Sequence, residues 1–276
     1  MGILNRTPDS FFDGGAHFAL DDLLRRAERL VADGAEVLDV GGVKAGPGPE
    51  VDEAEELERV VPAVEAMRAR FDVALSVDTW RASVAAACFA AGADVGNDIS
   101  GFADPDYLAV CAAAGASVVA THIRLRPRVA DPDPTYPGGV RRAVVAVLRD
   151  RADRALAAGI PAAGIMVDAG LDLGKREDQS LELLRASDDL VALGHPVLLS
   201  ASNKRFLGAL CAADVADRGA ATTAAHTLGI TLGCRVLRSH DVRASRRTAQ
   251  VVAALLEAAA EHDLPGLVLP AATATT

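Results

Sequence analysis

The chain has 276 residues, is 50% hydrophobic and carries a formal net charge of -10. This acidic balance excludes a broad basic surface for nucleic acid, which needs clustered Lys and Arg. No run reaches the roughly 18 apolar residues of a membrane span, and the first residues lack the basic and apolar segments of a signal peptide. We therefore expect a cytoplasmic globular protein with neither nucleic acid nor a membrane as its partner.

The four cysteines are spread along the chain, at Cys88, Cys111, Cys211 and Cys234. No two of them form a CxxC pair, so neither a zinc motif nor a redox motif is indicated. Most lie in apolar, helix-like stretches. This predicts buried thiols that stay reduced, as in the cytoplasm.

Eight short segments rich in β-forming residues alternate with helical stretches. In chain order, the segments cover 1–4, 36–40, 73–77, 94–96, 117–121, 164–167, 196–200 and 234–237. The first helical stretch covers 20–35, where apolar residues recur every three or four positions and Gly34 stands where a glycine ends a helix. The same scheme predicts helices in 80–94, 141–160, 179–195 and 221–234, and a last helix near 248–262.

The repeated unit is a strand followed by a helix. Right-handed units of this number most often close into a TIM (β/α)8 barrel of about 250 residues. We predict a single α/β TIM-barrel domain over 1–276, with residues 270–276 frayed. A doubly wound sheet is the alternative, but no GxGxxG motif follows the first strand. Because the strand signal starts at Met1, we expect either a natural start upstream or a short first strand with the base of the barrel open beside it.

In a TIM barrel the active site lies where the strands end, at the carboxyl face. Polar residues stand at the end of all eight predicted strands: Asn5, Asp39, Asp78, Asn97 with Asp98, His122, Asp168, Ser202 to Lys204, and Arg238 with His240. Any one of them alone has a second interpretation, since an Asp after a strand is often a helix cap. Eight polar strand ends that meet at one mouth favour a binding site.

The mixture of side chains indicates what the mouth binds. Asp78, Asp168 and Asn97 suit the donor and acceptor edge of a planar heterocycle. Lys204 and Arg238 add positive charge at the same rim and suit an anion such as a phosphate.

Two further residues complete this interpretation. His240 adds a hydrogen-bond donor. Asn5 offers a carbonyl oxygen that suits a hard cation such as Mg²⁺, which bridges phosphates and keeps several waters. The predicted site therefore holds a heterocycle below, with a phosphate and a metal above.

Five stretches, in this order and with suitable spacing, resemble the motifs of dihydropteroate synthase: MGILNRTPDSFFDGG, VDTWRASVAAACFAAGADVGNDISG, DAGLDLGK, SASNKRFLG and LRSHDV. The resemblance covers nearly the whole chain and implies a TIM barrel. It also implies a Mg²⁺-dependent transferase that joins 6-hydroxymethyl-7,8-dihydropterin pyrophosphate to p-aminobenzoate, giving dihydropteroate and pyrophosphate in folate biosynthesis. A homodimer formed through the late helices is the assembly that it implies.

The resemblance also implies roles by position. The pterin-binding set is Asp78, Asn97, Asp168 and Lys204. Asn5 contacts Mg²⁺ and the pyrophosphate, and Arg238 and His240 bind the leaving pyrophosphate. The residues expected to take part in catalysis are Asp78, Asp168, Lys204 and Arg238, with the two carboxylates stabilising the pterin cation that forms when the C–O bond breaks.

The chain departs from the family pattern on the p-aminobenzoate side. Ala45 and Gly46 stand where the family has Thr and Arg, and Arg205 stands where a small Ser helps to bind the benzoate. Asp172 replaces a glycine, and Leu173 replaces an aromatic residue of that pocket. The stretch THIRLRPRV carries three arginines in place of the usual methionines.

This pattern resembles the divergent, second synthase-like paralogue of some actinobacteria. A pterin-binding protein with lost or altered synthase activity therefore stands as the alternative to an authentic synthase. A third possibility is another pterin enzyme on the same barrel, such as a methyltransferase, which would have no evident use for Lys204 beside Arg238 and His240.

Overall fold

The computed structural model describes residues 1–6, 16–46, 48 and 50–261, apart from the side chains of 16–19 and 259–261. In these residues the strands are β1 (Gly2–Asn5), β2 (Val37–Gly41), β3 (Ala74–Asp78), β4 (Val95–Asp98), β5 (Ser117–Thr121), β6 (Ile165–Asp168), β7 (Leu198–Leu199) and β8 (Val236–Leu237). All eight predicted strands are present, with bounds that differ from the predicted segments by no more than two residues at either end.

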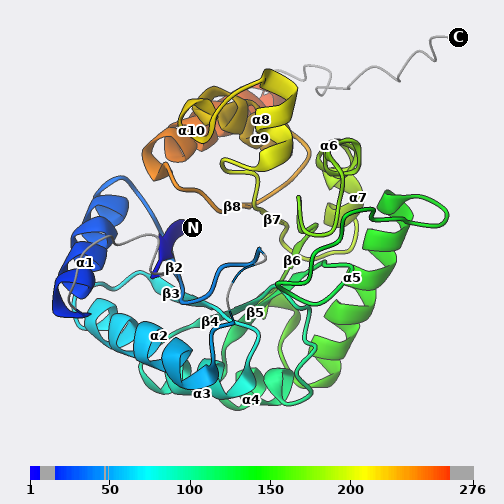
Figure 1. Ribbon diagram of the computed structural model, residues 1–276. Helices are drawn as coiled ribbons and strands as arrows, with labels where there is room; N and C mark the ends of the chain where they lie inside the picture. The colour runs from blue at the N-terminus through cyan, green and yellow to red at the C-terminus, as the bar shows by residue number, and fades with distance from the viewer. Residues whose placement is uncertain (7–15, 47, 49, 262–276) are drawn as a thin grey trace, which may run out of the picture.

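Ten α-helices lie between and after the strands in the described part of the chain. They are α1 (Ala16–Ala32), α2 (Glu53–Arg68), α3 (Ala82–Ala90), α4 (Tyr107–Ala113), α5 (Val140–Ala157), α6 (Glu177–Arg185), α7 (Ser187–Val191), α8 (Arg205–Cys211), α9 (Gly219–Thr231) and α10 (Val242–Glu261). Viewed along the barrel axis, they surround the strands as an outer layer (Figure 1).

Parallel pairing closes the strands into a ring. Strands β1 to β6 form one sheet in chain order, and β7 pairs with β8. Two single bridges join these sheets, Val167 with Val197 and Gly2 with Ser239. This closure confirms the barrel, because in a doubly wound sheet the first and last strands would not meet.

The first strand is paired on both sides. Its register sets Gly2 beside Leu38 of β2. On the other side, Met1 N donates to Leu237 O at 2.9 Å, and Ile3 N donates to Ser239 O at 3.0 Å. The first strand is short, with four residues, and is paired on both sides; an open base beside it and a start upstream of Met1 both stay predictions.

Two large apolar clusters hold the helices against the ring. One joins α1, α2 and α3 to β1–β3, and the other joins helices from α3 to α9 to β5, β6 and β7. Several strand interiors are fully buried, as parallel strands covered by helices must be. This packing holds the strands in place and so positions the residues at their ends.

The helices depart from the sequence prediction at two places. The pattern in 179–195 predicts one helix, but the backbone breaks at Ala186 (φ -97°, ψ 27°), so α6 and α7 are separate. The last helix begins at Val242, six residues before the predicted start. Glycines end the other predicted helices as expected, with φ of 98° at Gly34 and 107° at Gly92.

Three of the cysteines are buried, and Cys211 is exposed; all four are free thiols. No helix in the described residues is long and apolar enough to cross a membrane. The predicted tail 270–276 lies outside the described residues.

Candidate functional site

A buried carboxylate, Asp39 in β2, is the centre of a polar network inside the ring. Ser76 Oγ donates to its Oδ1 at 2.5 Å. Asn97 Nδ2 lies 3.2 and 3.3 Å from its two oxygens, and Arg238 Nε donates to Oδ2 at 2.6 Å. Asp39 has no exposed surface, so these donors offset the cost of burying its charge. The sequence placed Asp39 at a strand end but did not assign it to the site.

Arg238 extends the network to β3. Its Nη2 donates to Asp78 Oδ2 at 2.9 Å. Burial raises the pKa of Asp78 to about 7; the positive charge of Arg238 opposes this rise, and the negative charge of Asp39 adds to it. Although burial lowers the pKa of Arg238, the two carboxylates raise it above its ordinary value, so the guanidinium is charged.

Asp168 and Lys204 lie within electrostatic reach of this network. Asp168 Oδ1 accepts Gly170 N–H at 2.7 Å. Burial raises the pKa of Asp168, against the positive charges of Lys204 and Arg238. Burial also lowers the pKa of Lys204, against the negative charges of Asp172 and Asp168. The structure thus brings the predicted set Asp78, Asn97, Asp168, Lys204 and Arg238 to one mouth.

His240 stands at the same mouth, beside the end of β7. Its Nδ1 is 3.0 Å from Ser202 Oγ, and its backbone N–H donates to the same oxygen at 3.1 Å. Burial lowers the pKa of His240 to about 4, and Arg238, Arg26 and Lys204 also act to lower it. The imidazole is therefore neutral at pH 7.

Asn5 is the predicted metal contact, and it ends β1 with an exposed side chain. The register sets Asn5 beside Gly41, and Gly41 beside Asp78. Within the described ranges, no three His, Cys, Asp or Glu side chains are grouped as metal ligands. Mg²⁺ often takes only one or two protein oxygens and fills its shell with phosphates and water, so one amide oxygen fits it only together with a phosphorylated ligand.

Two strand-end residues have structural roles instead. Asp98 accepts Ser100 N–H, Ser100 Oγ–H and Phe102 N–H at 2.6 to 2.9 Å, so it shapes the turn after β4. His122 lies 2.9 Å from Lys175 Nζ through its Nδ1.

Lys175 is a buried lysine that the sequence pattern did not single out. Its side chain is almost fully enclosed, and Nζ also donates to the carbonyl oxygens of Gly170 and Leu173 at 2.9 and 3.0 Å. Burial lowers its pKa to about 7. Its place in a glycine-rich turn directly after a strand was the signal that could have identified it.

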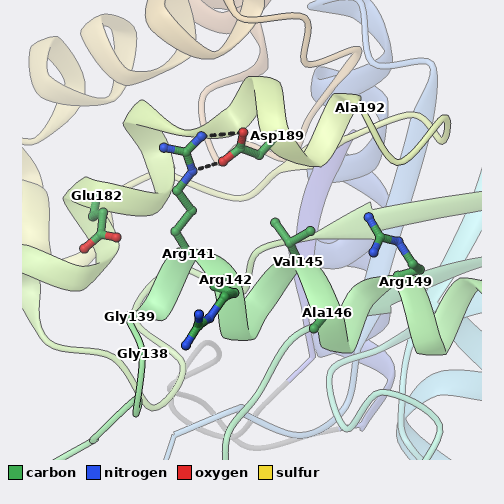
Figure 2. Close-up of a pocket in the computed structure, with 10 residues that line it drawn as sticks. All are labelled: Gly138, Gly139, Arg141, Arg142, Val145, Ala146, Arg149, Glu182, Asp189 and Ala192. Atoms are coloured by element: carbon green, nitrogen blue, oxygen red, sulfur yellow. Dashed lines mark hydrogen bonds and ion pairs between the residues drawn. The ribbon is translucent and has the colours of Figure 1, made fainter. Parts of the chain in front are cut away.

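A groove of about 570 Å³ lies elsewhere, between α5 and the pair α6 and α7 (Figure 2). Arg141 Nη2 spans it to Asp189 Oδ1 at 2.6 Å. None of its lining residues stands at a strand end, so the groove is separate from the mouth of the barrel.

Comparisons with known proteins identify the family. Residues 1–240 match the model of the family described as pterin binding enzyme. The chain belongs to the pterin binding enzyme family. It is 44% identical over 262 residues to the inactive dihydropteroate synthase 2 of Mycobacterium leprae, covering 92% of this chain and 89% of that protein.

Relatives named as synthases are also similar. The dihydropteroate synthase of Streptococcus pyogenes is 36% identical over 260 residues, covering 93% of this chain and 95% of that protein. The structure of Xanthomonas albilineans dihydropteroate synthase with 4-aminobenzoic acid superposes with a TM-score of 0.86 at 36% identity, covering 93% of this chain and 92% of that one. This likeness bears out the predicted barrel.

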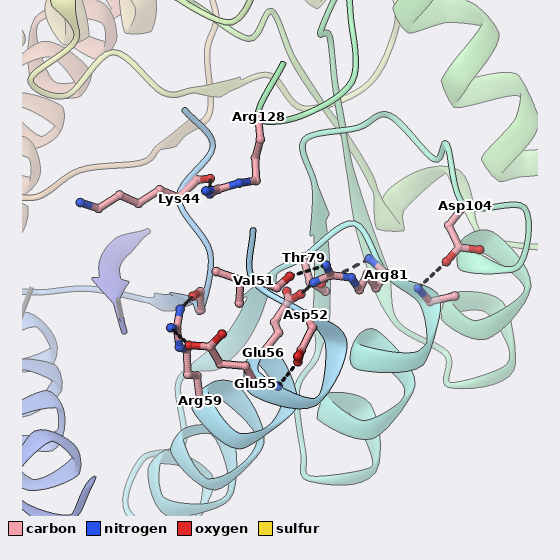
Figure 3. Close-up of polar contacts among 12 residues, drawn as sticks. Lys44, Val51, Asp52, Glu55, Glu56, Arg59, Thr79, Arg81, Asp104 and Arg128 are labelled. Carbon is pink, nitrogen blue, oxygen red and sulfur yellow. Dashed lines mark hydrogen bonds and ion pairs between the residues drawn. The ribbon is translucent and has the colours of Figure 1, made fainter. Parts of the chain in front are cut away.

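In this pterin binding enzyme the loop after β2 includes Ala45 and Gly46, the positions compared above with Thr and Arg of the family pattern. Three arginines from outside the loop hold its carbonyl oxygens (Figure 3): Arg59 Nη1 to Gly42 O at 2.7 Å, Arg128 Nη1 to Lys44 O at 2.8 Å, and Arg81 Nη2 to Val51 O at 2.7 Å. The backbone N–H of Arg128 also donates to Ala45 O at 3.2 Å. These contacts therefore hold the loop through backbone carbonyl groups at Gly42, Lys44, Ala45 and Val51.

Arg128 belongs to the arginine-rich stretch after β5, one of the departures noted in the sequence. A hollow of about 550 Å³ opens beside the loop, with Trp80, Arg81, Arg126 and Arg128 in its wall. Gly46 has open space around its α-carbon, whereas a side chain at Gly48 would meet the Arg128 guanidinium. The Arg128 guanidinium, from the loop after β5, thus lies against the loop after β2, where an arginine was expected in place of Gly46.

Two more departures contact each other at the start of α8. Asp172 Oδ2 accepts Arg205 N–H at 2.6 Å and lies 3.4 Å from Phe206 N. Asp172 has a φ of 66°, in the left-handed region that the glycine it replaces would adopt freely. Its Oδ1 is enclosed without a hydrogen-bond partner within the described residues.

Proposed function

We propose that this chain binds a pterin pyrophosphate at the mouth of the barrel, as a dihydropteroate synthase-type transferase. The observation that carries the proposal is the network in which Arg238 joins Asp39 to Asp78 beside Asn97. Several buried donors and acceptors on neighbouring strands present a fixed pattern to one edge of a planar heterocycle. Such a pattern discriminates strongly between ligands, because a mismatched ring leaves buried polar groups without partners.

The pyrophosphate group of the ligand would lie beside positively charged side chains. We assign Arg238 and His240 to the pyrophosphate end, because charged and neutral N–H donors are the groups that hold phosphate oxygens. Lys204, which belongs to the pterin-binding set, adds positive charge at the same rim. Asp168, with its carboxylate already fixed by Gly170 N–H, would accept from the ring.

Asn5 would hold Mg²⁺ together with phosphate oxygens and water. When bound, the ion would neutralise part of the negative charge on the leaving pyrophosphate.

The reaction proposed for this geometry is a substitution at the pterin methylene carbon. The amine nitrogen of p-aminobenzoate forms the new C–N bond, the C–O bond breaks, and pyrophosphate leaves with the electron pair while the amine releases a proton. Asp78 and Asp168 would stabilise positive charge on the pterin, and Arg238 and His240 would stabilise the leaving group.

A second candidate function is pterin binding without this coupling. It is favoured by the loop after β2, which has Ala45 and Gly46 where side-chain contacts are expected, and by the Asp172 carboxylate at the start of α8. The 44% identity to a protein named an inactive synthase points the same way.

Calorimetry and a product assay separate the two functions. Titrating the protein with the pterin pyrophosphate and Mg²⁺ tests binding, and adding p-aminobenzoate while following dihydropteroate tests coupling. Binding with product supports the transferase, and binding without product supports the second candidate. No binding to the wild-type chain would overturn both.

We also propose a cytoplasmic homodimer that forms through α10. Val251 and Leu255 lie four positions apart on this helix and are 61% and 60% exposed. Residues with this spacing share one helix face. Sedimentation should give a dimer for the wild-type chain and a shift toward monomer for Val251→Asp with Leu255→Asp, whereas a wild-type monomer would refute the assembly.

A further inference from the structure

Ser202 and His240 are joined by two contacts at the mouth of the barrel. The strands that precede them are in register, with Leu199 beside Leu237. This pairing places Ser202 Oγ 3.0 Å from His240 Nδ1 and 3.1 Å from the His240 backbone nitrogen. The backbone N–H must donate, so it takes one lone pair of the hydroxyl oxygen.

The hydroxyl proton of Ser202 then needs an acceptor. Two atoms are near enough: His240 Nδ1 at 3.0 Å and Ser239 Oγ at 3.5 Å, the latter at the limit of a hydrogen bond. Ser239 Oγ has Ser245 Oγ as a much closer neighbour, at 2.8 Å. His240 Nδ1 is therefore the better acceptor for the Ser202 proton.

Ser202, Ser239 and Ser245 form a row of hydroxyl groups, and His226 lies beside Ser245 at its other end. The hydrogen bonds there are consistent with donation from Ser202 to His240. His226 is fully buried, its Nδ1 is 3.2 Å from Ser245 Oγ, and its Nε2 is enclosed without a partner in the described residues. An enclosed N–H without an acceptor costs about 1–3 kcal/mol, so the His226 proton belongs on Nδ1, where it donates to Ser245. Ser245 can then donate to Ser239, and Ser239 to Asp241 O at 3.1 Å.

Ser245 Oγ also lies 2.9 Å from Asp241 O, so its proton has two acceptors, but in either case no donor is left for His240 Nδ1 except Ser202. A neutral imidazole that accepts at Nδ1 carries its proton on Nε2. His240 Nε2 has no hydrogen-bond partner among the described residues and is not one of their enclosed atoms, so it is open to a ligand.

We propose that Ser202 is a positioning residue that fixes His240 as the neutral Nε2–H tautomer, which presents an N–H donor to an anionic ligand oxygen. The ligand, a phosphate-bearing group, rests on the proposed function; the tautomer does not. The charged groups that face His240 are Arg238, Arg26 and Lys204, all positive, so they also favour the neutral ring.

Nitrogen-15 NMR of the histidine side chains in the full chain tests the tautomer directly. The chain has six histidines, and His240→Gln identifies the His240 signals by their loss. At pH 7 we expect the wild-type spectrum to show a protonated Nε2 and a bare Nδ1. Ser202→Ala should shift the ring toward a tautomer mixture, while Ser202→Thr, which keeps the hydroxyl, should restore the wild-type pattern.

Two results would overturn the proposal: a protonated Nδ1 in the wild-type chain, or an unchanged tautomer in folded Ser202→Ala. If the alanine variant does not fold, as circular dichroism would show, the wild-type spectrum and the threonine variant still decide.

Binding of inorganic pyrophosphate, measured by calorimetry, tests the consequence for the ligand. We expect Ser202→Ala to bind it about twofold to tenfold more weakly, as for a neutral hydrogen bond lost or misdirected, and Ser202→Thr to bind as the wild type does. Absence of pyrophosphate binding by the wild-type chain would count against the proposed function, whereas the NMR result alone decides the tautomer.

Discussion

Arg238, which follows β8, donates a hydrogen bond to Asp78 at the end of β3, although the two residues are 160 positions apart in the sequence. The same guanidinium donates to Asp39, so one cation is shared by two carboxylates. A ligand ring that donates to Asp78 would share this carboxylate with Arg238, because a carboxylate can accept several hydrogen bonds.

The two mouth carboxylates should be needed as carboxylates. We expect Asp78→Asn and Asp168→Asn each to weaken binding of the pterin pyrophosphate by about 1.5–3 kcal/mol, since an amide presents donors where acceptors are needed. The amide oxygen at 168 can still accept Gly170 N–H, so the fold should persist. Calorimetry checks this, and unchanged affinity in a folded variant would remove that residue from the site.

Ligand affinity should depend on pH through Asp78. With its pKa raised to about 7, Asp78 is mostly protonated at pH 6 and mostly ionised at pH 8. Ring N–H donors need the ionised form, so affinity should rise about tenfold across this range, with proton release on binding. Asp78→Asn, which lacks this carboxyl but keeps the ligand phosphates and the other titrating groups of the protein, is the control. An equal pH dependence in both proteins would contradict the assignment.

The loop after β2 should accept the side chains that it lacks. Because Gly46 has open space around it, Gly46→Arg with Ala45→Thr should be tolerated. If this is a synthase with a damaged second site, turnover with p-aminobenzoate should increase about tenfold to a hundredfold through a restored charge-assisted contact.

The double change is to be made with and without Arg205→Ser, because Arg205 stands where the family pattern has a small residue on the benzoate side. Arg128→Ala in the wild-type background is the matched control, since it removes the guanidinium that the stretch after β5 places against this loop. If the pterin binds but neither variant gains activity, pterin binding without coupling becomes the better account.

Asp172 should stabilise α8. Its Oδ2 accepts the first N–H of the helix, and losing such a cap costs about 0.5–2 kcal/mol. We expect Asp172→Ala to lower the free energy of unfolding by this amount. Asp172→Asn should lower it less, because Asn keeps an acceptor and tolerates the left-handed backbone. Equal urea midpoints for wild type and Asp172→Ala would refute the capping role.

Lys175 should matter for stability. Lys175→Met would leave His122 Nδ1 and the carbonyls of Gly170 and Leu173 without their donor, at about 1–3 kcal/mol for each buried acceptor. We expect a loss of about 3 kcal/mol or more in urea unfolding. Arg149→Met, on the exposed face of α5, is the matched control and should change stability little.

The parts of this fold that could be predicted from the sequence are those set by local pattern. Most strands are apolar runs that follow a helix ending in glycine. In a closed barrel of parallel strands, the polar residue after each run must lie at the carboxyl face. The break between α6 and α7 at Ala186 could not be predicted, because the helical spacing of apolar residues continues across it. Asp39 and Ser202 were present at strand ends, but their importance depends on partners that lie 58 and 38 positions away. No local signal specifies such contacts.

The contacts between β1 and β8, which close the barrel, have a consequence for biosynthesis. They join Met1 to Leu237, 236 positions apart, whereas β1 to β6 each pair with a strand close to them in the sequence. As the chain leaves the ribosome, those six strands can therefore assemble in order of emergence. The outer edge of β1 must wait until residues near Ser239 have been translated. For most of its synthesis, the nascent protein thus carries an open strand edge able to pair with the wrong chain.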